Sequence, residues 1–307
     1  MRSVSTVAVE QRVEPGWVRA LYSVGRFHIV AIAALACLTF GWAFTGRYLW
    51  LAVGACALDW FLVNLLNRIV DLREDTANGI VGTGFVARHR RPLTVVAGVL
   101  GPASLVGTHL LAPALTPLRL GYHALGAVYN YRLLPARQRL KELYALKNTA
   151  SDLGFLITCF GYPLAAVGGL DALRPDLGVP GLVLFGAFFF LFELSFEVIY
   201  DLRDVAGDRE AGVRSFAVVH GVRGAVWIAD ALMLGSLVVL VAGYALGHVP
   251  WRLAVMGAAP AAQLVIYRRW LADGVQAKHC LQLTWLGALL LALYHGWILL
   301  GLPGVDG

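Results

Sequence analysis

Polar side chains with the chemistry of a cation site gather in a short window of this sequence. Asn67, Asp71 and Asp75 follow each other at intervals of four residues. Residues four apart lie on the same face of a helix, so a helix here would present all three side chains together. Carboxylate oxygens are hard ligands, and the pattern is therefore typical of a site for a divalent cation such as Mg²⁺.

A second acidic window lies further along the chain. Glu197, Asp201, Asp204 and Asp208 step by four, three and four residues, which again predicts one helical face. With Glu74 and Glu210 included, the two windows hold eight of the 19 Asp and Glu residues. Because like charges on one face destabilise an isolated helix, this alignment indicates that cations lie between the carboxylates.

The two windows together suggest a ligand. Mg²⁺ takes one or two carboxylates and accepts phosphate oxygens as further ligands, so two such faces at one surface would hold a diphosphate between them. Arg73 and Arg203 each lie two residues after an Asp of these windows and would complete a clamp on the anion. We therefore expect a metal-dependent diphosphate site.

The elements that position these residues belong to a membrane protein. The chain has 307 residues, of which 59% are hydrophobic and 14% are charged, and its mean hydropathy is +0.69. Soluble domains carry about 25% charged residues, so the composition excludes a soluble globule and a disordered chain. We expect an all-α bundle of about nine transmembrane helices. Their approximate ranges are 27–46, 48–66, 93–112, 114–132, 148–168, 178–200, 223–247, 250–267 and 280–301.

The basic residues predict the orientation of this bundle. With nine spans and a cytoplasmic N-terminus, 21 of the 25 Lys and Arg residues fall on the cytoplasmic side. The net charge of +6 therefore reflects topology, and we expect no nucleic-acid partner. Residues 1–26 are interpreted as a retained cytoplasmic segment, with an interfacial helix from Trp17 to Arg26, and residues 27–307 as one transmembrane domain. Both acidic windows then face the cytoplasm.

Three isolated acids inside the predicted spans leave more than one interpretation open. Asp59 either faces a cavity or hydrogen-bonds to a neighbouring helix. Glu193 lies one turn before Glu197 and either extends the acidic stripe or has a paired structural role. Asp152 follows Lys147 closely, and we expect a local ion pair between the two.

These motifs resemble those of the UbiA-type family of intramembrane prenyltransferases. The first window matches the family's NxxxDxxxD motif, and Asn78 matches an Asn that often follows it. The stretch from Tyr200 to Gly221 resembles the second Asp-rich motif. The segment from Arg139 to Asn148 is similar to the basic RLK…KN segment that precedes the fifth helix of the family.

The resemblance implies a fold, a reaction and a set of roles. Family members enclose a central cavity with nine helices, bind an isoprenyl diphosphate through Mg²⁺ and transfer the prenyl group to a lipophilic acceptor. By resemblance, metal and diphosphate would be held by Asn67, Asp71, Asp75, Asp201, Asp204 and Asp208, with Asp71, Asp75, Asp201 and Asp208 as the catalytic residues. The charge of the leaving group would be neutralised by Arg139, Lys141, Lys147 and Arg203. We expect a multi-pass protein of a bacterial or archaeal cell membrane, with its active site toward the cytoplasm and no obligate protein partner.

The chain departs from the family pattern in three places. Arg68 stands where many members have Asp, and Glu197 where several have Asp. The Arg-Pro pair that usually comes soon after the first motif appears only at Arg91-Pro92, after a Gly-rich insertion from Gly79 to Gly84 and a basic run. Because that loop borders the active site in the family, these differences bear most on the acceptor.

Two questions stay open at this point. A transporter would also contain intramembrane carboxylates, as a path for cations or protons, although it would place them near the middle of several helices. Within the enzyme interpretation, the acceptor is an aromatic quinone precursor, a tetrapyrrole or a lipid. The second motif and the basic segment are closer to those of members that act on lipid or large lipophilic acceptors.

Overall fold

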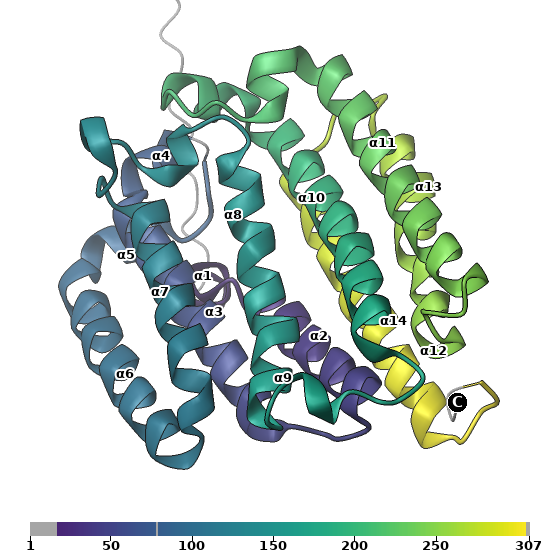
Figure 1. The fold of residues 1–307 in the computed structure, drawn as a ribbon. Helices are drawn as coiled ribbons and strands as arrows, with labels where there is room; N and C mark the ends of the chain where they lie inside the picture. The colour runs from purple at the N-terminus through teal and green to yellow at the C-terminus, as the bar shows by residue number, and fades with distance from the viewer. Residues whose placement is uncertain (1–16, 78, 305–307) are drawn as a thin grey trace, which may run out of the picture.

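The chain folds into an all-helical bundle. The computed structural model describes residues 17–77 and 79–304, and within them no β-strand forms beyond an isolated bridge between Leu134 and Gln138. Figure 1 shows the helices packed side by side, with the first and last parts of the chain in contact through α2 and α14. The α-helices are α1 Trp17–Gly25, α2 Phe27–Thr45, α3 Trp50–Val70, α4 Leu72–Ala77, α5 Thr83–Arg88, α6 Arg90–Leu111, α7 Thr116–Asn130, α8 Leu146–Phe155, α9 Tyr162–Ala166, α10 Gly178–Glu210, α11 Phe216–Ala245, α12 Trp251–Ala254, α13 Ala258–Trp270 and α14 Ala277–Leu299.

Six of these helices are long and apolar enough to cross a membrane, namely α2, α3, α6, α10, α11 and α14. The shorter helices α7, α8 and α13 fall in the other sequence-predicted spans. The prediction of an all-helical membrane bundle is therefore confirmed. The count of nine spans and the cytoplasmic N-terminus stay predictions.

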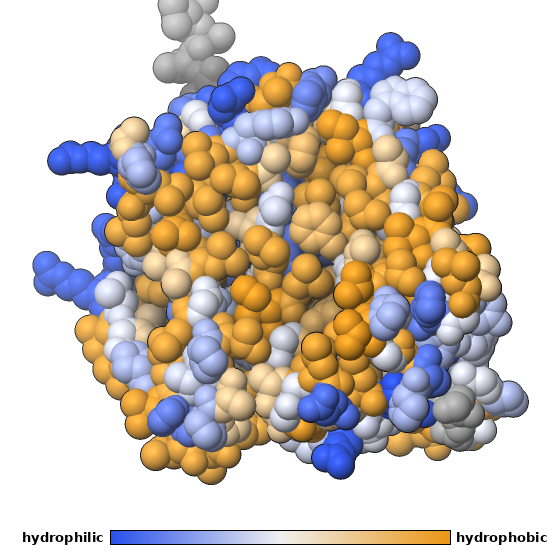
Figure 2. Space-filling view, viewed as in Figure 1, coloured by the Kyte–Doolittle hydropathy of each residue, from blue (hydrophilic) through white to orange (hydrophobic). Residues whose placement is uncertain are grey.

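The surface of the bundle matches a lipid environment. Large apolar side chains such as Leu110, Trp227 and Val238 are each about two-thirds exposed or more. In Figure 2, hydrophobic residues cover most of the side of the molecule, and hydrophilic side chains gather toward its upper and lower edges. Contiguous apolar surface of this extent marks contact with membrane rather than with water.

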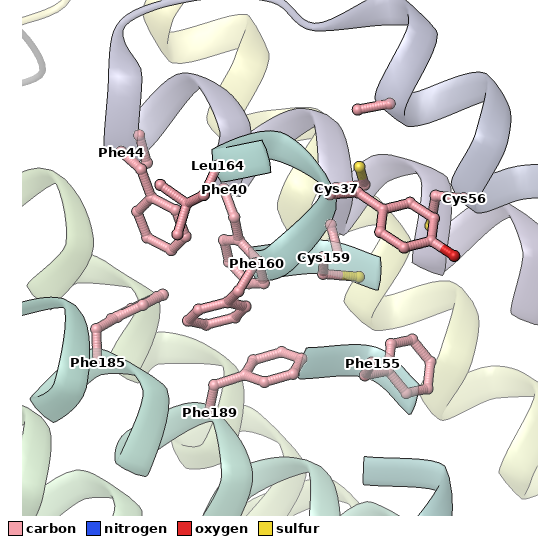
Figure 3. Packing of buried hydrophobic residues seen from close by; sticks show 14 of the residues in the cluster. Cys37, Phe40, Phe44, Cys56, Phe155, Cys159, Phe160, Leu164, Phe185 and Phe189 are labelled. Atoms are coloured by element: carbon pink, nitrogen blue, oxygen red, sulfur yellow. The ribbon is translucent and has the colours of Figure 1, made fainter. Parts of the chain in front are cut away.

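A cluster of aromatic rings packs the interior where α2, α10 and the helical turn Leu156–Gly161 after α8 meet. Phe40 lies 5.0 Å from Phe160 and 5.2 Å from Phe189, measured between ring centroids, and the three rings are labelled in Figure 3. Tilted and edge-on ring pairs at this spacing contribute about 0.5–1.5 kcal/mol each beyond the area that they bury. This cluster fixes the inner part of α10, whose outer part carries the second acidic window.

The first acidic window does not lie on one continuous helix. The helix α3 ends at Val70, Asp71 caps it with a backbone N–H bond to the Asn67 carbonyl, and α4 begins at Leu72. The second window, by contrast, lies within the unbroken helix α10. Figure 1 shows α4 and the last turns of α10 at the same end of the bundle. The fold thus brings the two windows to one surface.

A sharp break between α1 and α2 adds a basic residue to that end. Arg26 adopts a left-handed backbone conformation, with φ 45° and ψ 45°, which residues other than glycine rarely occupy. The Gly-rich loop packs beside this break, because a Cβ on Gly82 would lie only 3.2 Å from the Ala20 carbonyl oxygen. The predicted insertion is therefore docked against α1 at the edge of the functional end.

Candidate active site

The residues of the first motif form a connected polar group. The side-chain amide of Asn67 donates to an Asp71 carboxylate oxygen at 2.5 Å and to the side-chain oxygen of Asn130 at 2.8 Å. Asp75 turns away from this pair and accepts a hydrogen bond from Arg68 Nη1 at 2.7 Å. Arg68, a departure from the family pattern, therefore neutralises one of the three predicted ligands.

The basic segment between α7 and α8 lies over the first motif. Lys141 Nζ is 2.6 Å from Asp71 Oδ2 and 2.7 Å from Glu74 Oε2. Arg139 reaches the same two carboxylates, at 3.1 Å and 2.8 Å, and donates from Nε to Glu142. A segment without an α-helix of its own is thus held in place by ion pairs, with its basic groups beside the acids.

The second motif repeats this arrangement on α10. Lys147 Nζ lies 2.7 Å from Asp201 Oδ1 and 2.7 Å from Asp208 Oδ2. One ammonium group therefore bridges two carboxylates that lie seven residues apart on the same face of α10. Asn148 donates to the other oxygen of Asp201 at 2.8 Å. Arg203 pairs with Asp204 on the same helix.

The two groups line one cavity of about 220 Å³. Its polar end contains the aspartates of the two motifs with Lys141 and Lys147, and its inner part is lined by apolar residues that include Val63, Leu125 and Phe155. A charged end joined to an apolar interior suits an amphipathic ligand that carries an anionic head and a hydrocarbon chain.

The paired carboxylates of this cavity have cationic groups between them, which offset their mutual repulsion. Within residues 17–77 and 79–304, no three Asp, Glu, His or Cys side chains lie together as a ready metal site. Instead, the ammonium groups of Lys141 and Lys147 occupy the space between paired carboxylates. The donor set is of the all-oxygen kind that Mg²⁺ prefers, and the residues fit this ion once the lysines turn to phosphate oxygens.

The structure brings most of the sequence-predicted site residues to this cavity. It is lined by Asn67, Asp71, Asp75, Lys141, Lys147, Asp201, Arg203, Asp204 and Asp208. Arg139 acts behind this lining, through its ion pairs with Asp71 and Glu74. Arg73 is exposed and does not line the cavity. Asn78 lies outside the described residues.

The expected ion pair between Lys147 and Asp152 is wrong. Lys147 points to the open end of the cavity and is taken up by Asp201 and Asp208, while both carboxylate oxygens of Asp152 are buried without a hydrogen-bond partner. Asp152 instead lies close enough to Glu193 and Glu197 on α10 for their charges to repel its own. Proximity in sequence failed here because residues five apart on a helix point in different directions.

The sequence analysis missed three polar residues of the site. Glu74 receives bonds from both Lys141 and Arg139, and its place between two motif aspartates was the available signal. Asn130 closes the Asn67 network from the end of α7. Arg26 lines the cavity and donates to the neutral side chain of Asn64 at 3.2 Å, and only its left-handed backbone marks it as unusual.

Burial and charge act differently on the neighbouring acids Asp71 and Glu74. Burial raises the pKa of Asp71 above its usual value, against the opposing charges of Lys141 and Arg139. Burial also pushes the pKa of Glu74 upward, but the hydrogen bonds and charges of Lys141 and Arg139 outweigh it and lower the pKa. Asp71 thus still gains from added positive charge, whereas Glu74 is stabilised by its basic partners.

A second charged cluster lies deeper in the bundle. Asp59 on α3 accepts hydrogen bonds from Arg119 Nε at 2.8 Å and from the Tyr162 hydroxyl at 2.7 Å, and His123 lies 2.9 Å away. Arg119 also donates to the Ser104 carbonyl at 2.8 Å. Of the two interpretations of Asp59, the structure shows the hydrogen bond to neighbouring helices.

Comparison with known proteins identifies a family and a shared fold. The model of the UbiA prenyltransferase family matches residues 27–293, which is most of the chain. No curated protein matches the chain.

Solved structures share the fold at low sequence identity. A UbiA homolog from Archaeoglobus fulgidus bound to GPP and Mg²⁺ superposes with a TM-score of 0.68 at 14% identity, over 90% of this chain and 97% of that one. The same homolog bound to DMAPP and Mg²⁺ gives 0.67 at 14% identity, with the same coverage. A solved structure of digeranylgeranylglyceryl phosphate synthase gives a TM-score of 0.56 at 13% identity, over 92% of this chain and 96% of that one. The transporter alternative finds no support, since the family model that matches is that of the UbiA prenyltransferases and the similar solved structures are of a UbiA homolog.

Proposed function

The chain belongs to the UbiA prenyltransferase family, and on that premise we propose that it transfers a prenyl group from an isoprenyl diphosphate to a lipophilic acceptor. One observation carries the proposal. Two groups of carboxylates, each bridged by a lysine, face each other across the charged end of a cavity with an apolar interior. The similar fold of the A. fulgidus homolog, which was solved with GPP and Mg²⁺, agrees with such a ligand.

The diphosphate would lie at the charged end, held from both sides. Mg²⁺ bound there would be held by carboxylates of the two motifs and would offset the charge that develops on the leaving diphosphate. Lys141 and Lys147 are placed to donate to its oxygens once they leave their carboxylates. Arg26, whose only side-chain hydrogen bond within the described chain goes to Asn64, adds a further cation at the cavity wall. The proposed metal ligands are Asn67, Asp71, Asp75, Asp201, Asp204 and Asp208.

The prenyl chain would extend into the apolar part of the cavity. There Val63, Leu125 and Phe155 exclude water from the allylic carbon, so that the acceptor can attack before water does. The acceptor would be an aromatic quinone precursor, a tetrapyrrole or a lipid. We further propose that this charged end faces the cytoplasm.

A radiolabelled transfer assay tests the proposal. Purified protein in nanodiscs is incubated with Mg²⁺, labelled dimethylallyl or geranyl diphosphate, and a panel of the three acceptor classes. We expect Mg²⁺-dependent diphosphate release and a prenylated product. Asp71→Ala and Asp208→Ala should each lower the rate at least about a hundredfold, equivalent to about 3 kcal/mol of lost transition-state stabilisation.

Glu210→Ala is the matched control, because Glu210 is an exposed acid at the end of the same helix α10. It should retain the parent rate. Absence of both product and diphosphate release in the parent protein, or unchanged rates in both Asp variants, would refute the proposal.

A further inference from the structure

One short segment carries both lysines of the candidate active site. Lys141 pairs with acids of the first motif and Lys147 with acids of the second, and five residues lie between them. The backbone hydrogen bonds of this stretch are local, from the Leu143 N–H to the Leu140 carbonyl at 3.1 Å and from the Leu146 N–H to the Leu143 carbonyl at 3.2 Å. The segment therefore depends on side-chain contacts for its position against the rest of the bundle.

Tyr144, halfway between the two lysines, contacts the start of α11. Its hydroxyl lies within hydrogen-bonding distance of His220 Nε2, at 2.6 Å. Its ring meets that of Phe216 edge-on, with 5.5 Å between the centroids, and the Arg214 guanidinium lies 5.9 Å from the ring centroid. Figure 1 shows the segment before α8 at the same end of the bundle as the start of α11. One aromatic side chain thus joins the lysine-bearing segment to another helix.

The backbone of the next residue is strained. Ala145 has φ 62° and ψ −24°, in the left-handed region that residues other than glycine rarely occupy. This reversal lies between Tyr144 and the first turn of α8, which contains Lys147. A strained conformation persists only where its surroundings hold it. Here the contacts of Tyr144 lie on one side of Ala145 and the ion pairs of Lys147 on the other.

A ligand would act differently on these two kinds of contact. Lys141 and Lys147 must leave their carboxylates in order to donate to a diphosphate. That exchange removes ion pairs that hold the segment to the two motifs. The contacts of Tyr144 involve no acid, and among the described residues neither Tyr144 nor His220 lines the cavity. Ligand binding therefore leaves the contacts of Tyr144 in place.

We propose that Tyr144, held by the start of α11, is a positioning residue that anchors the segment while its two lysines exchange carboxylates for the diphosphate. The proposal rests on the prenyl-transfer function proposed above and deepens it. Tyr144 does not touch the substrate and acts through Lys141 and Lys147. Without this anchor, the middle of the segment would lose its position once the lysines turn to the ligand.

A merely structural role for Tyr144 predicts a different pattern. It would support the segment equally in the free and the ligand-bound protein, so its loss would loosen the segment in both. An anchor matters most when the ion pairs of the lysines are given up. Its loss should therefore loosen the segment chiefly in the bound state.

Hydrogen exchange measured by mass spectrometry separates these patterns in the full-length protein in nanodiscs. The protein is compared alone and with Mg²⁺ plus geranyl S-thiolodiphosphate, an analogue that resists ionisation. The reporters are the amides of Leu143 and Leu146. In Tyr144→Ala, we expect their exchange to match the parent protein within about twofold without ligand and to be at least about tenfold faster with it.

Transfer rates per folded protein, measured well below the Tm, give a second readout. Tyr144→Ala should lower the rate about 10- to 100-fold, the range seen for residues that orient functional groups. Tyr144→Phe keeps the ring contacts and loses one hydrogen bond, so we expect a loss of about 2- to 10-fold. Tyr131→Ala is the matched control and should behave as the parent protein does. Tyr131 is an exposed tyrosine at the end of α7, without a ring contact or side-chain hydrogen bond in the described part of the chain.

Three results would overturn the anchoring role. They are parent-like exchange of Tyr144→Ala with ligand bound, equally faster exchange with and without ligand, and parent-like transfer rates in both Tyr144 variants. Absence of both Mg²⁺-dependent diphosphate release and product in the parent protein would instead count against the proposed function. The two failures are therefore distinguishable.

Discussion

The charged groups at the open end of the cavity and those around Asp59 are built from the same residue types but differ in how they are enclosed. Asp59 and Arg119 are fully buried, and their partners come from α3, α6, α7 and α9. Lys141 and Lys147 also bridge carboxylates, but they line a cavity that a ligand can enter.

The difference teaches what an ionisable residue in a membrane helix indicates. Such a residue is a candidate for function because it is costly to bury. In Asp59, neighbouring helices offset that cost, which makes the group part of the packing. Asp201 and Asp208 share one charged partner, Lys147, which lines the cavity and can exchange with a ligand. Whether the partners of a charged residue are enclosed by helices or open to a cavity therefore separates a structural role from a role in ligand binding.

The largest effect is expected where a partner of the enclosed cluster is removed. Arg119→Met would leave Asp59 as a buried charge without its main partner, and we expect the free energy of unfolding to fall by about 3–5 kcal/mol. Thermal unfolding in nanodiscs measures this as a large drop in Tm. Arg269→Met, at an exposed position of α13, should change stability by less than about 0.5 kcal/mol. An unchanged Tm for Arg119→Met would remove the distinction between the two clusters.

The second prediction concerns the open end. Lys147→Met removes the bridge between Asp201 and Asp208 and should lower the rate of prenyl transfer at least about a hundredfold, or about 3 kcal/mol in the barrier. Its Tm should fall by less than that of Arg119→Met, because these carboxylates reach a solvent-accessible cavity. Transfer rates and Tm are measured on the same preparation. A variant that unfolds as readily as Arg119→Met while retaining its transfer rate would contradict the comparison.

A smaller effect is expected for Glu74, which holds two basic side chains in position. Glu74→Gln keeps the shape of the side chain but weakens its bonds to Lys141 and Arg139. We expect kcat/KM for the prenyl diphosphate to fall about tenfold, the lower end of effects seen for residues that orient functional groups. Steady-state kinetics checks this, with Glu210→Gln as the control. A rate equal to that of the parent protein would show that the basic segment positions itself without Glu74.

The smallest effect concerns pH, at an ion pair outside both clusters. The hydrogen bond from Arg252 is the main reason that the pKa of Asp176 lies below its usual value of 3.8. Because the folded-state pKa is lowered, this pair stabilises the protein above the unfolded pKa and loses that contribution as the pH falls through the folded pKa. Asp176 is partly exposed, so the loss is small. Unfolding curves between pH 6 and 3 should differ slightly between the parent protein and Asp176→Asn, and the difference should narrow toward the acid end.

The sequence allowed the fold and the two motifs to be predicted because both depend on spacing. Apolar stretches gave the helical bundle, and intervals of three and four residues placed Asp201, Asp204 and Asp208 on one helix. The same rule failed to foresee that α3 ends at Val70, because the end of a helix depends on local capping rather than on period.

Contacts between distant segments could not be predicted from spacing. The choice of Lys147 for Asp201 and Asp208, rather than for Asp152, depends on how α8 packs against α10. The position of Arg26 at the cavity depends on its left-handed backbone conformation, which no sequence pattern predicted.

The lysines between the carboxylates bear on the order in which ligands bind. In the free protein, a metal ion must displace an ammonium group that already has two ionic partners. A diphosphate that arrives with the metal brings oxygens to which Lys147 and Lys141 can turn, so each ligand makes the binding of the other more favourable, and by the same factor. We therefore expect weak binding of Mg²⁺ alone and strong, cooperative binding of the metal and the prenyl diphosphate together. The metal site then stays largely empty until the prenyl diphosphate binds.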